Sequence, residues 1–186
     1  MDQWLEGGLS AVGDPAYDLF FPGDPVPRPE GRPFALSEAR EADLRQRLDS
    51  ITLTAKQRRK IKSSISQGRK WRRLENYRTT VRLVLLEQVP GHQTIQEPIL
   101  AVMEFFRERP KKKTGDLVTV RPDAKNLIWA LEDALNPRFK LVSRKRIKTW
   151  PGFWEDDALV TPVGVRRFAK NRREVGSRLR VWPLTG

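Results

Sequence analysis

The spacing of apolar residues predicts three helices in the first half of the chain. The first runs from Ser37 to about Ile51, with apolar residues on one face and charges elsewhere. The second begins at Thr54, whose spacing to Gln57 is that of a capping box. The third occupies roughly residues 71–88, because four apolar residues recur there at helical steps: Leu74, Tyr77, Val81 and Leu85. That stripe is expected to lie in the core.

Short apolar runs predict strands before and after these helices. Four segments fit a strand pattern: Tyr17–Phe21, Ile99–Phe106, Leu159–Phe168 and Arg178–Trp182. We expect 99–106 to be the central strand. The first run ends in the proline-rich segment 22–29, which can be neither helix nor central strand. Residues 1–16 are expected to form an irregular leader.

Composition and charge narrow the function. The chain has 186 residues, enough for one domain with a real core, and its net charge is +13. Such an excess is typical of proteins that bind a polyanion, with nucleic acid first and anionic membrane second. The absence of cysteine excludes disulfide scaffolds and zinc fingers, and the single histidine excludes a multi-histidine metal site. No signal-peptide pattern is visible at the N-terminus, so the cytoplasm is the expected compartment.

Basic residues are concentrated in three stretches. Between positions 56 and 73 there are nine basic residues and no acid: Lys56, Arg58, Arg59, Lys60, Lys62, Arg69, Lys70, Arg72 and Arg73. Like charges at helical spacing repel, so a run without counter-charges suggests that DNA phosphates supply them. A merely soluble surface is the alternative. The other stretches contain Lys111, Lys112 and Lys113, and then Arg138, Lys140, Arg144, Lys145, Arg146 and Lys148.

Acidic residues mark a candidate metal site in the second half of the chain. Asp123 stands where a helix over residues 123–135 would begin, after Pro122. Asp156 and Asp157 form an adjacent pair in a turn that enters a strand. Together these carboxylates could bind a hard divalent cation, which prefers oxygen ligands. The alternative is a helix cap and a solvated turn with no metal.

Two motifs resemble the RusA-like Holliday junction resolvases. The first is Pro-Asp-x-x-Asn-Leu with Asp-Ala-Leu downstream, and the second is Gly-Phe-Trp-x-Asp-Asp-Ala-x-Val. The resemblance implies an α/β (α+β) fold: a single compact domain over residues 17–186, with a small mixed sheet packed by helices and a basic helical insertion at about 37–70. It further implies a homodimer that uses Mg²⁺ to cleave four-way or other branched DNA in recombination and repair.

By position, the resemblance assigns Asp123, Asp156 and Asp157 to the family's metal-binding acids. Asn126 matches the Asn of the family's first motif, and Asp133 matches the acid of Asp-Ala-Leu. Two positions depart from the pattern, because Lys125 replaces the family's second Asp and Trp129 replaces its Lys. Lys125 and Trp129 are i, i+4 neighbours that can form a cation–π contact. Glu155 could supply the missing carboxylate, Lys125 could act directly on a phosphoryl oxygen, or the site no longer cuts.

The sequence therefore supports two main hypotheses. The first is a magnesium-dependent endonuclease for branched DNA, with Asp123, Asp156, Asp157 and Lys125 as catalytic residues and the three acids as metal ligands. The second is a catalytically weakened relative that binds branched DNA without cutting it; a basic RNA-binding protein with chance motifs is a distant third. DNA contacts are expected from Lys56, Arg58, Arg59, Lys60, Arg69, Lys70, Arg72, Arg73, Lys111, Lys112, Lys113, Arg144, Lys145 and Arg146. Trp150, Phe153 and Trp154 could stack at a branch point or lie in the core, and we expect the core for Phe153.

Overall fold

The computed structural model of the chain describes residues 13–29, 36–49, 53–109 and 123–184. Ile51, the lysines 111–113 and most of the expected leader lie outside these ranges. Within them, no helix is both long and apolar enough to cross a membrane.

A four-stranded mixed sheet forms the centre of the molecule. Its order is β1 (Tyr17–Pro22), β6 (Gly176–Pro183), β2 (Ile99–Arg107) and β5 (Val160–Phe168). β2 pairs in parallel with β5, whereas the β1–β6 and β6–β2 pairs are antiparallel. All four predicted strands are confirmed. The parallel pair needs a crossover connection, and the chain between β2 and β5 contains the helix α4 (Ala124–Leu135).

Residues 55–88 form one continuous helix, α3 (Ala55–Gln88), so the expected break before residue 71 is wrong. The capping box of Thr54 and Gln57 is confirmed at its start. A glycine inside a helix costs only about 1 kcal/mol relative to alanine. Packing explains the glycine at position 68 of α3, because a Cβ there would lie only 2.3 Å from the Cβ of Leu36.

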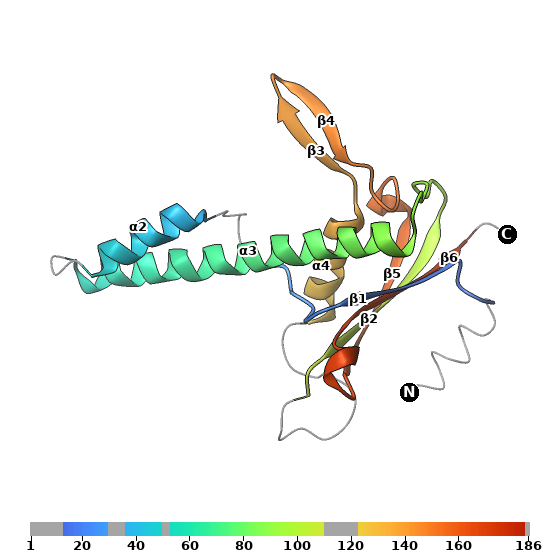
Figure 1. Cartoon of the computed structure of the whole chain (residues 1–186), viewed down its shortest axis with the longest axis horizontal. Coiled ribbons are helices and arrows are strands. Elements are labelled where there is room, and N and C mark those ends of the chain that lie inside the picture. The colour runs from blue at the N-terminus through green and yellow to red at the C-terminus, as the bar shows by residue number, and fades with distance from the viewer. Residues whose placement is uncertain (1–12, 30–35, 50–52, 110–122, 185–186) are drawn as a thin grey trace.

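The main core lies between the sheet and the helices α3 and α4 (Figure 1). The predicted apolar stripe of α3 is confirmed, because Leu74, Tyr77, Val81 and Leu85 are all buried. The Tyr77 hydroxyl is hydrogen-bonded to the Ser177 hydroxyl at 2.9 Å, and burial raises the pKa of Tyr77. Where α4 packs against the sheet, Gly164 of β5 leaves room for Ile128 of α4. A Cβ added to Gly164 would lie 2.5 Å from the Cδ1 of Ile128.

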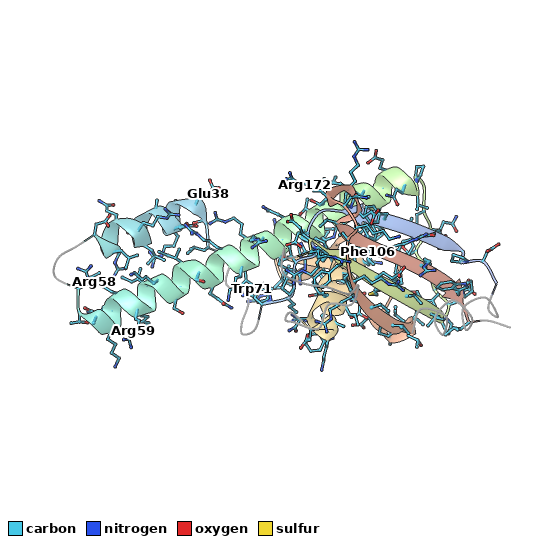
Figure 2. The ribbon with its side chains drawn as sticks, turned by 90° about the horizontal axis from the view of Figure 1, so that it is seen from below. Glu38, Arg58, Arg59, Trp71, Phe106 and Arg172 are labelled. Atoms are coloured by element: carbon cyan, nitrogen blue, oxygen red, sulfur yellow. The ribbon has the colours of Figure 1, made fainter. Side chains whose placement is uncertain are left out.

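The N-terminal half of α3 extends beyond the sheet and pairs with α2 (Glu38–Leu48), as Figure 1 shows. We call this pair the helical arm. It has a small core of its own, made by four buried residues: Leu36, Leu44, Ile61 and Ile65. In Figure 2, Arg58 and Arg59 lie at the end of the arm that is far from the sheet, and Trp71 lies where the arm meets the body.

A second projection is a two-stranded hairpin made of β3 (Arg138–Val142) and β4 (Lys145–Trp150). Figure 1 shows that it points away from the four-stranded sheet. The sequence indicated only a basic insert here. Its two-residue turn, Ser143 and Arg144, has positive φ angles of 47° and 67°. Such turns usually contain Asn-Gly, so the standard hairpin signal is missing from the sequence.

Candidate functional site

Asp123 is the N-cap residue of α4, as its position after Pro122 predicts. Its backbone is extended, and its carboxylate accepts a hydrogen bond from the backbone N–H of Asn126 at 3.0 Å. This satisfies one of the free donors of the first helical turn and places a negative charge at the positive end of the helix dipole. The side chain is exposed and therefore open to a ligand.

The acidic pair before β5 is positioned by the hydrogen-bonded segment 153–155. The Phe153 N–H donates to the Leu135 carbonyl at 2.6 Å, and the Glu155 N–H donates to the Ile95 carbonyl at 2.9 Å. The Phe153 carbonyl accepts from the Ile95 N–H at 3.0 Å. The indole N–H of Trp154 donates to the side-chain oxygen of Asn136. These bonds tie the segment to the end of α4 and fix where the next two residues, both acids, emerge.

The aromatic residues of this segment belong to the core. Phe153 and Trp154 are fully buried, as expected for Phe153, so a stacking role for either at a branch point is excluded by their burial. Trp150 is half-buried and packs against the same core. The ring of His92 stacks on Phe153 at 4.3 Å between centroids, and its Nε2 lies 2.9 Å from the Phe153 carbonyl. A carbonyl only accepts, so Nε2 carries the proton.

The electrostatics of the acidic pair favour a cation. The backbone N–H of Ala158 and a hydrogen bond with Asp157 lower the pKa of Asp156. The same hydrogen bond with Asp156, together with burial and the neighbouring charge, raises the pKa of Asp157. Burial and the charges of Asp157 and Asp133 also raise the pKa of Glu132. Negative charge is therefore crowded here, and a bound cation would relieve the repulsion.

The three predicted metal ligands are not gathered at one point. Glu132 lies near Asp157, whereas Asp123 caps the opposite end of α4, about 13 Å away along the helix axis at 1.5 Å per residue. Across the described ranges, no three acidic or histidine side chains could hold one metal ion. The donor chemistry of Asp156 and Asp157 still fits Mg²⁺, which is commonly held by one or two carboxylates together with water and substrate phosphates. The three-acid site stays a prediction.

The two substituted positions form the expected cation–π contact. The Lys125 ammonium lies 4.6 Å from the centroid of the Trp129 ring, and the Arg28 guanidinium lies 5.7 Å from it. Trp129 is exposed, so the contact is worth about 0.5–1 kcal/mol. The backbone N–H of Arg28 also donates to the backbone carbonyl of Asn126 at 3.0 Å, which fastens the proline-rich segment to α4. An aromatic ring with two cations therefore occupies the surface where the resemblance predicts an acid and a lysine.

Asp133 has a structural role that its motif position did not reveal. Its carboxylate is hydrogen-bonded to Arg78 of α3 and lies 3.7 Å from Arg28. Arg82 of α3 donates to the carbonyls of Ala134 at 2.9 Å and Asp133 at 3.3 Å, so it caps the C-terminal end of α4. Desolvation lowers the pKa of Arg82 to about 10. These contacts join α4 to α3, and no local sequence signal identifies them.

Part of the positive charge of the arm is neutralised within the chain. Glu41 of α2 is buried and accepts hydrogen bonds from Arg69 at 2.7 and 2.9 Å and from Arg72 at 3.0 Å. Arg73 lies 4.0 Å from Asp24. The expectation that this stretch lacks counter-charges is therefore wrong for three of its arginines, because the acids come from elsewhere in the sequence. Arg58 donates to the Leu48 carbonyl at 3.4 Å.

Other cations of the arm remain open to a ligand. In the described part of the chain, no carboxylate pairs with five of them: Lys56, Arg59, Lys60, Lys62 and Lys70. A groove of about 520 Å³ between α2 and α3 is lined by Arg45, Lys62, Arg69, Lys70 and Arg73. A larger hollow of about 990 Å³ lies on the other side of the sheet, where Glu104 pairs with Arg167 and Arg180. That hollow contains none of the predicted site residues.

Two comparisons with known proteins bear on this site. The family profile described as endodeoxyribonuclease RusA matches residues 50–143, which include α3, β2 and α4. The matched range starts inside the segment expected to be an insertion, contains Asp123 and Asp133, and ends before Asp156. None of the curated proteins compared with the chain matches it. The mixed sheet, the capped helix α4 and the profile match over half of the sequence agree, and the chain belongs to the RusA endodeoxyribonuclease family.

Proposed function

We propose that this protein is a magnesium-dependent endonuclease that cleaves four-way or other branched DNA. The family is one of Holliday junction endonucleases. The observation that carries the finer proposal is the Asp156–Asp157 pair, which is exposed, held by a buried segment and crowded with negative charge. In a chain with a net charge of +13, such a pair of exposed acids is unusual, and it suits a metal cation that binds both the carboxylates and a DNA phosphate.

Each part of the protein has a distinct task in this proposal. Mg²⁺, when bound, would activate a water and offset the charge that builds on the phosphoryl oxygens. Asp156 and Asp157 would hold the ion; Asp123 stays the predicted third ligand, although within one chain it lies about 13 Å along α4 from their end of the helix. Lys125 would supply a positive charge to a phosphoryl oxygen after leaving the Trp129 ring, a contact weak enough to break. The unpaired cations of the arm would bind DNA phosphates.

A second candidate function is favoured by the surface around Trp129. The ring and its two cations stand where the resemblance places an acid and a lysine, and neither Lys125 nor Trp129 can supply a carboxylate to a metal ion. A protein with this surface could bind branched DNA without cutting it. We also propose a cytoplasmic location and a homodimer. For the cutting function, the reason for a dimer is that symmetric cuts across a four-way junction need two active sites.

Cleavage of a synthetic four-way junction, with and without Mg²⁺, tests the proposal directly. The variants Asp156→Asn and Asp157→Asn should each abolish cleavage and leave junction affinity unchanged or improved, since the amide removes ligand charge but keeps the shape. Asp123→Asn tests the third acid cleanly, because asparagine is also a good N-cap residue. Glu87→Gln is the matched control, because it removes an exposed carboxylate of α3 to which no role in the site is assigned.

The pair Lys125→Asp and Trp129→Lys separates the two candidate functions. If the wild type does not cut, restoring the family's acid–lysine pair should raise magnesium-dependent cleavage at least tenfold, which corresponds to about 1.4 kcal/mol of barrier. If Lys125 acts on the phosphoryl group, the wild type cuts and Lys125→Ala loses on the order of a hundredfold. An inactive wild type that stays inactive in the folded double variant would leave only the binding function.

A further inference from the structure

The β3–β4 hairpin exposes an unusual amount of apolar surface. Of the eight large apolar side chains that are exposed in the described chain, four lie on this hairpin: Phe139, Leu141, Val142 and Ile147. Leu141 is 68% exposed and Ile147 is 49% exposed. Apolar residues gathered on a projecting element are typical of a contact surface.

The strand register places apolar and basic side chains on both faces of the hairpin. Neighbours along a strand point to opposite faces, and partners across the ladder share a face. One face therefore contains Phe139 and Leu141 with their partners Lys148 and Arg146. The Arg146 guanidinium lies 4.2 Å from the Phe139 ring centroid, which agrees with this assignment.

The opposite face has the same character. It contains Val142 and Ile147 with their partners Lys145 and Lys140. A hairpin that lies on a single surface needs only one apolar face. Because both faces contain apolar and basic side chains, we expect the hairpin to insert into a gap in its binding partner and to be contacted on both faces.

The charge of the hairpin indicates which kind of partner provides this gap. Five hairpin cations have no carboxylate partner within the described ranges: Lys140, Arg144, Lys145, Arg146 and Lys148. There is also no acid in the sequence between Asp133 and Glu155. The hairpin of a second copy has the same five unpaired cations and would repel it, so the proposed homodimer would form through another surface, whereas a polyanion with apolar faces is attracted. DNA has both features, because its bases are apolar on their faces and its backbone is anionic.

The base of the hairpin is fixed while its tip is free. At the base, Arg138 donates to the carboxylate of Glu75 on α3 at 2.8 Å, and Arg82 lies 5.9 Å from the centroid of the Trp150 ring. At the tip, Ser143 and Arg144 both have the left-handed backbone that glycine adopts most easily. The hairpin tip therefore has the cationic Arg144 at a position where glycine would be less strained, and strained backbone is common at functional positions.

We infer that the β3–β4 hairpin inserts between bases at the branch point of DNA, a role that rests on the proposed function. Leu141 and Ile147 would contact bases that have lost a stacking neighbour, and the surrounding lysines and arginines would bind phosphates on both sides. Stacking is already interrupted at a branch point, so separating bases there costs less than within a continuous duplex. The hairpin therefore gives a physical reason for preferring branched over linear DNA.

Base unstacking at the junction centre tests this inference. The full chain is titrated in EDTA, which prevents cleavage, into four-way junctions with 2-aminopurine either at the branch point or well inside an arm. We expect fluorescence to rise several-fold at the branch point only. The variant Leu141→Ser with Ile147→Ser should lose this rise and most of the preference for junction over linear duplex. Leu83→Ser with Leu86→Ser is the matched control, since these α3 side chains are 62% and 54% exposed.

A second measurement does not depend on the serine variants. The chain has no cysteine, so Leu141→Cys introduces a single thiol. By thiol–disulfide exchange, this thiol should displace the small thiol of an activated disulfide on a base at the branch point and become linked to that base, whereas Leu83→Cys should not. Equal crosslinking by both, or an unchanged 2-aminopurine signal in the hairpin variant, overturns the inference and leaves the proposed function intact. A hairpin variant that changes the mass in light scattering but not DNA binding points to a protein partner and also overturns it. A wild type that does not bind branched DNA overturns both.

Discussion

The buried carboxylate of Glu41 should hold α2 on α3, and Glu41→Gln should release it. Glu41 accepts hydrogen bonds from Arg45 on its own helix and from Arg69 and Arg72 on α3. Arg72 also donates to the Leu36 carbonyl at 2.8 Å, so the same network fixes the chain that enters α2. Replacing the carboxylate by an amide would leave three guanidinium groups beside one another without their shared counter-charge.

The size of the effect follows from the exposure of these groups. Hydrogen bonds to charged groups are worth about 1.5–3 kcal/mol, but solvent screens the arginines, which are partly exposed. We therefore expect Glu41→Gln to weaken the docking of α2 by about 1–2 kcal/mol, a factor of roughly 5–30. The small core of the arm is separate from the main core, so the change should appear as local opening of α2 rather than as global unfolding.

Amide hydrogen exchange, read by mass spectrometry, measures this opening directly. Peptides from residues 38–48 should exchange faster in Glu41→Gln, whereas peptides from β2 should keep the wild-type rate. Glu38→Gln is the matched control, because Glu38 is on the same helix but almost fully exposed and 3.9 Å from Arg72. Unchanged protection of α2 in Glu41→Gln would refute the view that this carboxylate docks the helix.

Three further outcomes can be checked. Replacing Lys56, Arg59, Lys60 and Lys70 by Gln should flatten the salt dependence of junction binding by about 0.9 log unit per lost phosphate contact, and an unchanged slope would assign the arm to a solvated surface. Gly152→Ala should lower the stability by about 1–3 kcal/mol in thermal unfolding, since its φ is 88° and an added Cβ would lie 2.8 Å from Pro137; an unchanged midpoint would contradict this. Glu75 is desolvated, but hydrogen bonds from Arg138 and Arg78 outweigh that and lower its pKa. Its contribution to stability is thus present above its ordinary pKa of 4.5 and lost as the pH falls through the lowered value, so Glu75→Gln should destabilise the protein at pH 7 and much less in acid.

Local signals predicted much of the fold. The spacing of Thr54 and Gln57 located the start of α3, and Asp123 located the start of α4, because capping depends on residues within one turn. The strands were visible as apolar runs. The continuity of α3 was missed because the apolar stripe was recognised only from Leu74 onward. The packing of Leu36 against Gly68 depends on a residue far away in sequence, so local spacing could not reveal it.

The hairpin was missed for a different reason. Its strands have no core to face, so apolar residues do not alternate with polar ones in the usual way, and Ser143 and Arg144 are rare in such turns. The pairing of Arg69 and Arg72 with Glu41 was also invisible, since it joins residues about thirty positions apart. Motif matching brought Asp123 together with Asp156 and Asp157, but the length of α4 separates them within the chain.

The distribution of charge connects these observations. Where the protein is packed, each cluster of arginines shares a carboxylate: Glu41 in the arm, Glu75 and Asp133 between the helices, and Glu104 on the sheet. Most of the positive charge without a carboxylate partner is therefore not in the body but on two projections, the helical arm and the β3–β4 hairpin. The acidic pair, Asp156 and Asp157, follows β4 by only a few residues. The lysines and arginines of the two projections would attract DNA and hold it beside Asp156 and Asp157, where negative charge is crowded. A metal cation would have to neutralise these two acids before a phosphate could approach them. In the proposed function, the arrangement that would bind the DNA would therefore also make cleavage depend on the metal.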